Sequence, residues 1–249
     1  MYSIAFAGKG GTGKTTLAGI LIRYLVDKGL TPVLAVDADA NANLNEVLGL
    51  EVRETLGEAR EQMKKCVGSG MTKDVFMEMK IQEAVVESDG FDLIVMGRPE
   101  GAGCYCAANS LLRQYLERLI GNYKYIVMDN EAGMEHLSRL TTNNIDALLA
   151  VSDATRRGLQ AASRIVSLAE ELKLNIRDKY VLVNLAKDGQ AEDIKEAADA
   201  FGLELIGVVP EDEGIRAYDL KGIPTMKLPS DNKALQAAYE VFDRLVGCH

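Results

Sequence analysis

The chain has 249 residues, a size that fits one large α/β domain, and a composition that is ordinary for a globular protein: 47% apolar and 26% charged. This composition excludes collagen-like, disordered and coiled-coil chains, and no apolar stretch is long enough to span a membrane. The formal net charge of −9 disfavours nucleic acid and membrane lipid as partners, because their phosphates would be repelled. Four cysteines are too few for a secreted disulfide scaffold, so we expect a cytoplasmic protein.

Seven apolar runs of strand length recur along the chain, and each is continuous rather than alternating. Such runs are typical of strands that are buried on both faces of a sheet. They are residues 4–7, 33–36, 93–96, 125–128, 147–151, 180–183 and 205–209. The first run leads directly into a glycine-rich loop and follows no charged segment, so we expect a buried strand rather than a signal peptide.

Apolar residues at helical spacing lie between these runs, most clearly over residues 17–25 and 159–172. The segment 51–88 is longer and more polar than a simple crossover, and we expect it to form two helices outside the sheet. No proline- or serine-rich linker divides the chain. The sequence therefore predicts one α/β domain over residues 1–249, with a mostly parallel seven-stranded sheet and helices on both faces.

A glycine-rich loop, GKGGTGKT over residues 8–15, matches the phosphate-loop pattern G-x-x-x-x-G-K-[ST] and lies between a predicted strand and a predicted helix. Its glycines let the backbone wrap around a phosphate, and the following helix adds positive potential. We expect Lys14 to bridge the terminal phosphates, the Thr15 hydroxyl to bind Mg²⁺ and Thr16 to reach the α-phosphate. The expected nucleotide-binding residues of the loop are Gly8, Lys9, Gly10, Gly11, Thr12, Gly13, Lys14, Thr15 and Thr16.

Carboxylates follow two of the predicted strands, with Asp37 and Asp39 after the second and Asp129 after the fourth. The carboxyl ends of parallel strands face the ligand crevice of such a sheet. Asp129 ends an apolar strand in the Walker B pattern, and we expect it to hold Mg²⁺ directly or through water. Gly133 is expected to supply an N–H group that senses the γ-phosphate. Asp37 and Asp39 can alternatively be simple helix caps.

A second lysine inside the phosphate loop, Lys9, gives the sequence GKGGTGKTT. This loop resembles the deviant Walker A motif of the class that contains MinD, ParA and the nitrogenase iron protein. The resemblance implies that Lys9 crosses a dimer interface to the other subunit's nucleotide, where a cation offsets transition-state charge. It also implies that Asp39 orients or deprotonates the attacking water and that Asp37 helps to organise the metal shell. Lys9, Lys14 and Asp39 are thus the expected catalytic residues, while Ala40 replaces a proline common in the class.

Proteins of the same class recognise adenine through an asparagine and through residues around a proline late in the chain. The matching residues here are Asn184, Val209 and Pro210. An asparagine side chain carries both the acceptor and the donors that the adenine edge needs. The segment after Asn184 lacks the N-K-x-D spacing of guanine-specific proteins, so ATP is favoured over GTP.

Two cysteines, Cys104 and Cys106, stand at C-x-C spacing before a predicted helix. Two thiolates cannot close a four-ligand site alone, but a face-to-face dimer would bring four sulfurs together. Four thiolates suit Zn²⁺, Ni²⁺ or an iron–sulfur cluster. Taken alone, the pair can equally be two half-buried small residues. No role is assigned to four further residues: Cys66, Cys248, Glu131 and His136.

Four segments together, GKGGTGKTT, VDADANANL, CYCAANS and MDNEAGMEHL, resemble the CooC-type nickel-insertion ATPases, and the similarity extends over essentially the whole chain. The resemblance implies an ATP- and Mg²⁺-dependent homodimer that carries Ni²⁺ or Zn²⁺ on Cys104 and Cys106. It also implies a client nickel enzyme, either carbon monoxide dehydrogenase or acetyl-CoA synthase, and no motif distinguishes the two.

Two alternatives within the broader class stay open. A redox ATPase of the nitrogenase-iron-protein type takes a cluster cysteine from the region after Asp129, where residues 129–142 contain none. A positioning ATPase of the MinD/ParA type binds membrane or DNA. Its membrane-binding members end in a basic amphipathic helix, whereas the polar face of residues 234–246 is not basic.

Overall fold

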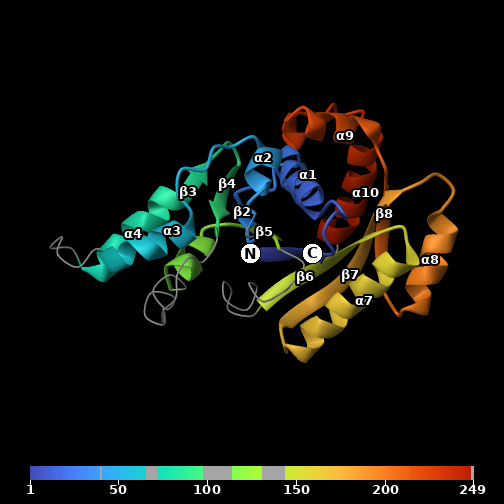
Figure 1. Ribbon diagram of the computed structural model, residues 1–249, viewed down its shortest axis with the longest axis horizontal. Helices are drawn as coiled ribbons and strands as arrows, with labels where there is room; N and C mark the ends of the chain where they lie inside the picture. The colour runs from blue at the N-terminus through green and yellow to red at the C-terminus, as the bar shows by residue number, and fades with distance from the viewer. Residues whose placement is uncertain (40, 66–71, 98–113, 131–143, 248–249) are drawn as a thin grey trace.

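The computed structural model describes residues 1–39, 41–65, 72–97, 114–130 and 144–247, and its helices surround an eight-stranded sheet (Figure 1). Across the sheet the strands follow the order β3-β4-β2-β5-β1-β6-β7-β8. Their bounds are β1 (Tyr2–Gly8), β2 (Val33–Asp37), β3 (Val85–Glu87), β4 (Phe91–Val95), β5 (Tyr125–Asp129), β6 (Asn144–Asp153), β7 (Asn175–Ala186) and β8 (Leu205–Pro210). Neighbouring strands are parallel except for β3 and β4, which are antiparallel.

The seven predicted apolar runs correspond to the seven parallel strands, so the mostly parallel α/β sheet is confirmed. The expected number of seven strands was wrong, because β3 adds an eighth strand at one edge. β3 has three residues, none of them buried, and it pairs with β4. A partly buried strand of three residues is too short to give a recognisable apolar run in the sequence.

The helices lie on both faces of the sheet, as predicted. One face is covered by α3 (Leu56–Lys65), α4 (Lys73–Ala84), α7 (Arg156–Glu171) and α8 (Ala191–Ala200), which share one apolar core. The other face is covered by α1 (Lys14–Asp27), α2 (Leu44–Leu48) and α10 (Lys233–Gly247). Between β8 and α10 lie α9 (Glu213–Leu220) and the short 3₁₀ helix η1 (Thr225–Lys227). The two helices expected within residues 51–88 are therefore present as α3 and α4. Among the described helices, none has the length and apolar composition needed to cross a membrane.

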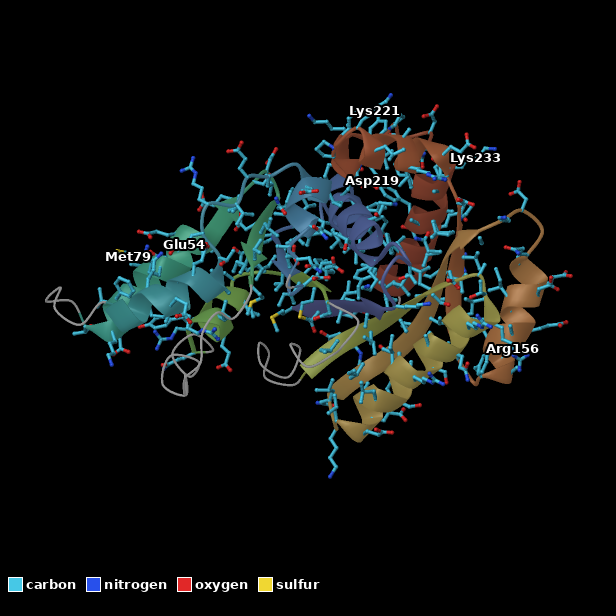
Figure 2. The ribbon with its side chains drawn as sticks, viewed as in Figure 1. Glu54, Met79, Arg156, Asp219, Lys221 and Lys233 are labelled. Carbon is cyan, nitrogen blue, oxygen red and sulfur yellow. The ribbon has the colours of Figure 1, made fainter. Side chains whose placement is uncertain are left out.

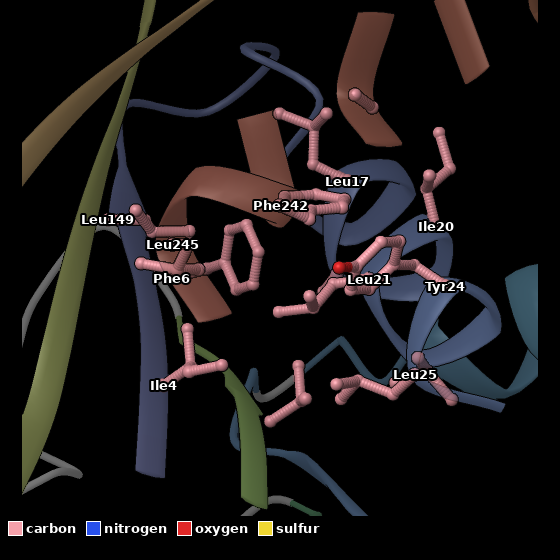
Figure 3. Packing of buried hydrophobic residues seen from close by; sticks show 14 of the residues in the cluster. Ile4, Phe6, Leu17, Ile20, Leu21, Tyr24, Leu25, Leu149, Phe242 and Leu245 are labelled. Carbon is pink, nitrogen blue, oxygen red and sulfur yellow. The ribbon is translucent and has the colours of Figure 1, made fainter. Parts of the chain in front are cut away.

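The core on the α1 face is built around the first strand. All seven residues of β1 are buried, as expected for a central strand covered on both sides. Phe6 of β1 and Phe242 of α10 are among the largest fully buried side chains, and they pack with Leu17 and Leu21 of α1 (Figure 3). This packing fixes the start of α1, and therefore the phosphate loop before it, against the end of β1.

The chain order reverses at β1, which has β5 on one side and β6 on the other. Ligand crevices of parallel sheets form at such points, beyond the carboxyl ends of the strands. Asp129 of β5 lies in register with Phe6 of β1 and with Asp37 of β2. The sheet thus brings the phosphate loop and two predicted carboxylates to one edge.

A matched pair of leucines tests this core. Leu21 is fully buried, whereas Leu220 of α9 is 79% exposed. We expect Leu21→Ala to lower the free energy of unfolding by about 3 kcal/mol, because it leaves a cavity between α1 and β1. Leu220→Ala is expected to stay within about 0.5 kcal/mol of the wild type. Urea denaturation measures both, and equal losses for the two variants would contradict the packing described.

Candidate functional site

The phosphate loop joins β1 to α1 and is closed by its own polar groups. Gly11 and Gly13 have φ values of +82° and +80°, in the left-handed region that favours glycine. The Thr12 hydroxyl donates to the Lys9 carbonyl at 2.9 Å. The Lys14 ammonium donates to the same carbonyl at 3.3 Å, and the Lys14 side chain is buried. The loop therefore holds one cation folded inward at the start of α1.

Lys9 differs from Lys14 although both lie in one loop. Its side chain is exposed and makes no hydrogen bond or ion pair with any residue in the described ranges. The two lysines thus divide the site into an internal cation and a cation that extends away from its own chain.

The carboxylates of Asp37 and Asp129 are buried side by side at the ends of β2 and β5. Asp37 accepts hydrogen bonds from the backbone N–H groups of Asp39, at 3.1 Å, and Leu44, at 2.9 Å. Burial, together with the neighbouring Asp129, raises the pKa of Asp37 to about 7 despite these bonds. Because Leu44 begins α2, Asp37 does contribute to the start of a helix, which was the alternative role considered for it.

Asp129 lacks the partners that Asp37 has. Neither of its carboxylate oxygens accepts a hydrogen bond of normal geometry from a residue that the structure describes. Burial raises its pKa to about 6, while the nearby Thr15 hydroxyl and Lys14 ammonium lower it. A buried carboxylate without donors is costly, and carboxylate and hydroxyl oxygens are the ligands of hard divalent cations. Asp129, Asp37 and Thr15 thus form a donor set that fits Mg²⁺.

The segment after β2 turns sharply at the same edge. Asp39 is half-buried, and its Oδ1 atom accepts the backbone N–H of Asn41 at 2.8 Å. Ala42 has a φ of +50°, an uncommon value for a residue with a side chain. The Asp39 carboxylate also raises the pKa values of Asp37 and Asp129, so the three acidic groups interact electrostatically.

A pocket of about 630 Å³ extends the site away from the phosphate loop. It is lined by Gly11, Gly13 and Thr16 of the loop and α1, by Asn184, Val209 and Pro210, and by residues of α9. The structure therefore brings the three predicted base-contacting residues together beside the phosphate loop. The lining from α9 was not predicted. Its signal in the sequence is Asp212, whose side chain accepts the backbone N–H of Ile215 and so begins a helix after β8.

The orientation of the Asn184 side chain bears on the base that this pocket accepts. Its Nδ2 atom donates to the Thr12 carbonyl at 2.9 Å, and the side chain is buried. Only the amide NH₂ can donate to a carbonyl, so Oδ1 is the atom left as an acceptor. Oδ1 can accept a hydrogen bond from the exocyclic amino group of adenine, so this orientation is compatible with the expected adenine base.

Several predicted residues lie outside the described ranges, and the structure adds nothing about them. They are Ala40, Cys66, Cys104, Cys106, Glu131, Gly133, His136 and Cys248. Among the described residues, no cluster of three or more histidine, cysteine or carboxylate side chains has an arrangement that could hold a metal ion.

Known proteins share this fold. The profile of the CobQ/CobB/MinD/ParA nucleotide-binding domain family matches residues 4–225. The chain belongs to this family. An uncharacterized ATP-binding protein of Methanocaldococcus jannaschii is 45% identical over 248 residues, or 98% of each chain. The carbon monoxide dehydrogenase accessory protein CooC of Rhodospirillum rubrum is 33% identical and covers 88% of each chain.

Solved structures of family members agree. MinD of Aquifex aeolicus, in a complex with MinC, has a TM-score of 0.74 and 25% identity, covering 99% of this chain and 96% of that one. MinD of Pyrococcus horikoshii, solved with Mg-ADP, has a TM-score of 0.71 and 25% identity, covering 99% and 98%. This member of the CobQ/CobB/MinD/ParA family is therefore an ATP-binding P-loop ATPase.

The burial of Asp129 predicts a pH dependence of stability. Its pKa of about 6 in the folded chain exceeds the ordinary value of 3.8, so the folded state binds more protons between these pH values. Stability is therefore lost as the pH rises through this window. Asp129→Asn removes that titration. Without nucleotide, we therefore expect the free energy of unfolding of the variant, relative to that of the wild type, to increase by ~2 kcal/mol when the pH is raised from about 4.5 to about 7.5. Urea denaturation at both pH values measures the gain, and a pH-independent difference would contradict it.

Contact between the loop and Asn184 predicts a second effect. A Cβ atom at Gly13 would collide with Nδ2 of Asn184, whereas one at Gly29 has nothing within 4 Å. Both glycines have positive φ, at +80° and +68°, so Gly29→Ala is a control for backbone strain alone. We expect Gly13→Ala to weaken ATP binding by about tenfold or more and Gly29→Ala to leave it unchanged, as measured by calorimetry. Equal ATP affinities of Gly13→Ala and Gly29→Ala would show that the contact between the loop and Asn184 is unimportant for ATP binding.

Proposed function

We propose that this ATPase is a metallochaperone that binds nickel between two subunits and assists its insertion into carbon monoxide dehydrogenase or acetyl-CoA synthase. The observation that carries the proposal is the C-x-C pair, Cys104 and Cys106, in a chain 33% identical over most of its length to a carbon monoxide dehydrogenase accessory protein. Nickel is here the cargo, and the nucleotide site is the part that drives its transfer.

The nucleotide site is assigned as follows. Lys14 and the backbone of residues 8–16 hold the phosphates, and Thr15, Asp37 and Asp129 hold Mg²⁺. The support is the donor set at one strand edge, where Asp129 lacks hydrogen-bond donors among the described residues. When bound, Mg²⁺ supplies positive charge to the phosphate oxygens. Asp39 orients the attacking water, and Asn184, Val209 and Pro210 contact the adenine.

A dimer makes both sites complete. Lys9 extends from its own loop without a described partner, as a lysine that reaches the nucleotide of a second subunit requires. Two thiolates per subunit supply the four sulfurs of one soft metal site only when two copies meet. ATP binding, which closes the dimer, therefore alters the metal site. Hydrolysis reopens the dimer and releases the metal to the client.

Metal titration of the purified protein tests the proposal. We expect the wild type to bind one Ni²⁺ or Zn²⁺ per two chains and to elute as a dimer on size-exclusion chromatography with MgATP. Cys104→Ser and Cys106→Ser are expected to lose the metal. Cys66→Ser and Cys248→Ser are matched controls that keep it. Lys9→Ala is expected to bind MgATP and remain monomeric.

Three outcomes would overturn parts of this assignment. Unchanged metal content in both Cys104→Ser and Cys106→Ser would end the metal-carrier proposal and leave the ATPase assignment intact. A brown dimer with the absorbance and electron paramagnetic resonance of an iron–sulfur cluster would replace it with a redox ATPase. Dimerisation of Lys9→Ala with MgATP equal to that of the wild type would remove Lys9 from the interface.

A further inference from the structure

A leucine at the base pocket has an unusual backbone conformation. Leu185, directly after Asn184, has a φ of +58°. The left-handed region is disfavoured for residues with a branched apolar side chain, and glycine or asparagine normally occupies it. The pairing of β7 with β8 shifts register between Val183 and Ala186, so Leu185 lies in an irregularity of the ladder.

The residues on either side of Leu185 are anchored. Asn184 is buried and donates to the Thr12 carbonyl, and Ala186 is buried and its carbonyl accepts the N–H of Glu211 at 2.9 Å. These two anchors fix the backbone before and after Leu185. The strained conformation is therefore imposed by the surrounding structure, as at many ligand-binding sites.

The side chain of Leu185 lines the pocket and remains 40% exposed. Among the other apolar residues of the lining, Leu17, Ile20 and Val209 are almost completely buried, whereas Pro210 and Ile215 are partly exposed. Leu185 is more exposed than any of these, so it supplies the most apolar area that a bound molecule can still cover. Apolar area left uncovered beside a polar anchor is what the face of a nucleobase requires.

We propose that Leu185 positions the nucleobase: its side chain forms an apolar wall for the face of the base, while Asn184 Oδ1 meets the edge. The strained backbone directs the side chain into the pocket. A glycine or asparagine would suit the backbone better and would leave that wall absent. This inference rests on nucleotide binding, which belongs to the family, and is independent of the metal cargo.

Calorimetric titration with MgATP and with magnesium tripolyphosphate tests the role. Leu185→Ala is expected to weaken MgATP binding about tenfold, because the base loses its apolar contact, and to leave tripolyphosphate binding unchanged. Leu185→Met, which keeps an apolar side chain of similar size, is expected to restore ATP affinity to within about twofold of the wild type.

Leu185→Gly separates binding from stability. It lacks the side chain, as Leu185→Ala does, but it relieves the strain. We expect its melting temperature to exceed that of Leu185→Ala by about 2 °C, whereas the two variants share the same loss of ATP affinity. Leu172→Ala, at a leucine of similar exposure (46% against 40%) outside the pocket, is the control that keeps full affinity.

Three results would overturn the proposal. They are wild-type ATP affinity in Leu185→Ala, an equal loss of ATP and tripolyphosphate binding, and recovery of ATP affinity in Leu185→Gly. The last result would mean that backbone strain alone, and not the apolar wall, governs binding. None of them bears on metal binding at the cysteines, so failure here and failure of the metallochaperone proposal are distinguishable.

Discussion

Burial of two carboxylates at adjoining strand ends is the constraint on which the site depends. Asp37 and Asp129 lie in register on β2 and β5, and the charge of Asp129 raises the pKa of Asp37. Burying the two carboxylates costs free energy, and the surrounding elements offset this cost more fully for Asp37 than for Asp129. Asp39 and the first residue of α2, Leu44, donate backbone N–H groups to Asp37, whereas among the described residues Asp129 has only the nearby Thr15 hydroxyl and Lys14 ammonium. Electrostatic interactions therefore link the phosphate loop, the β2–α2 segment and β5. A divalent cation bound between them would offset the negative charge of the buried carboxylates.

Much of this arrangement could be predicted because it leaves local patterns in the sequence. The parallel strands are continuous apolar runs, and the phosphate loop has fixed glycine and lysine spacing. The edge strand β3 was missed because its residues are only partly buried, so tertiary pairing and not composition makes it a strand. Leu185 was missed for a related reason. Its left-handed backbone accompanies the register shift between β7 and β8. The sequence has no glycine or asparagine at this position that would have indicated it.

The net charge of −9 does not describe the local electrostatic potential at this edge of the sheet. An acidic molecule attracts a triphosphate only where cations and backbone N–H groups are concentrated, and the phosphate loop provides both. Lys14 is turned inward onto the Lys9 carbonyl, a neutral acceptor that leaves its charge for phosphates within its own loop. Lys9 is exposed on the same loop, where its charge is directed away from that loop. The two lysines, five residues apart, therefore have different roles. The buried Lys14 can act only within its own loop, whereas the exposed Lys9 can reach a group outside it.

Two of the three described non-glycine residues with positive φ, Ala42 and Leu185, lie at the carboxyl edge of the sheet beside the candidate site. Among the described non-glycine residues with positive φ, Ala42 follows Asp39 and Leu185 follows Asn184, while Lys173 lies just beyond α7. A fold tolerates such positions only when neighbouring structure over-determines them. At Leu185 the anchors are Asn184 and Ala186, while the β1–α1–α10 core holds the phosphate loop against β1 (Figure 3). On the outer side, α9 has no buried residue, and Asp219 on it lines the pocket (Figure 2). The pocket thus has one wall formed by the phosphate loop and one wall formed by α9, whose Ile215 packs partly buried against the same core.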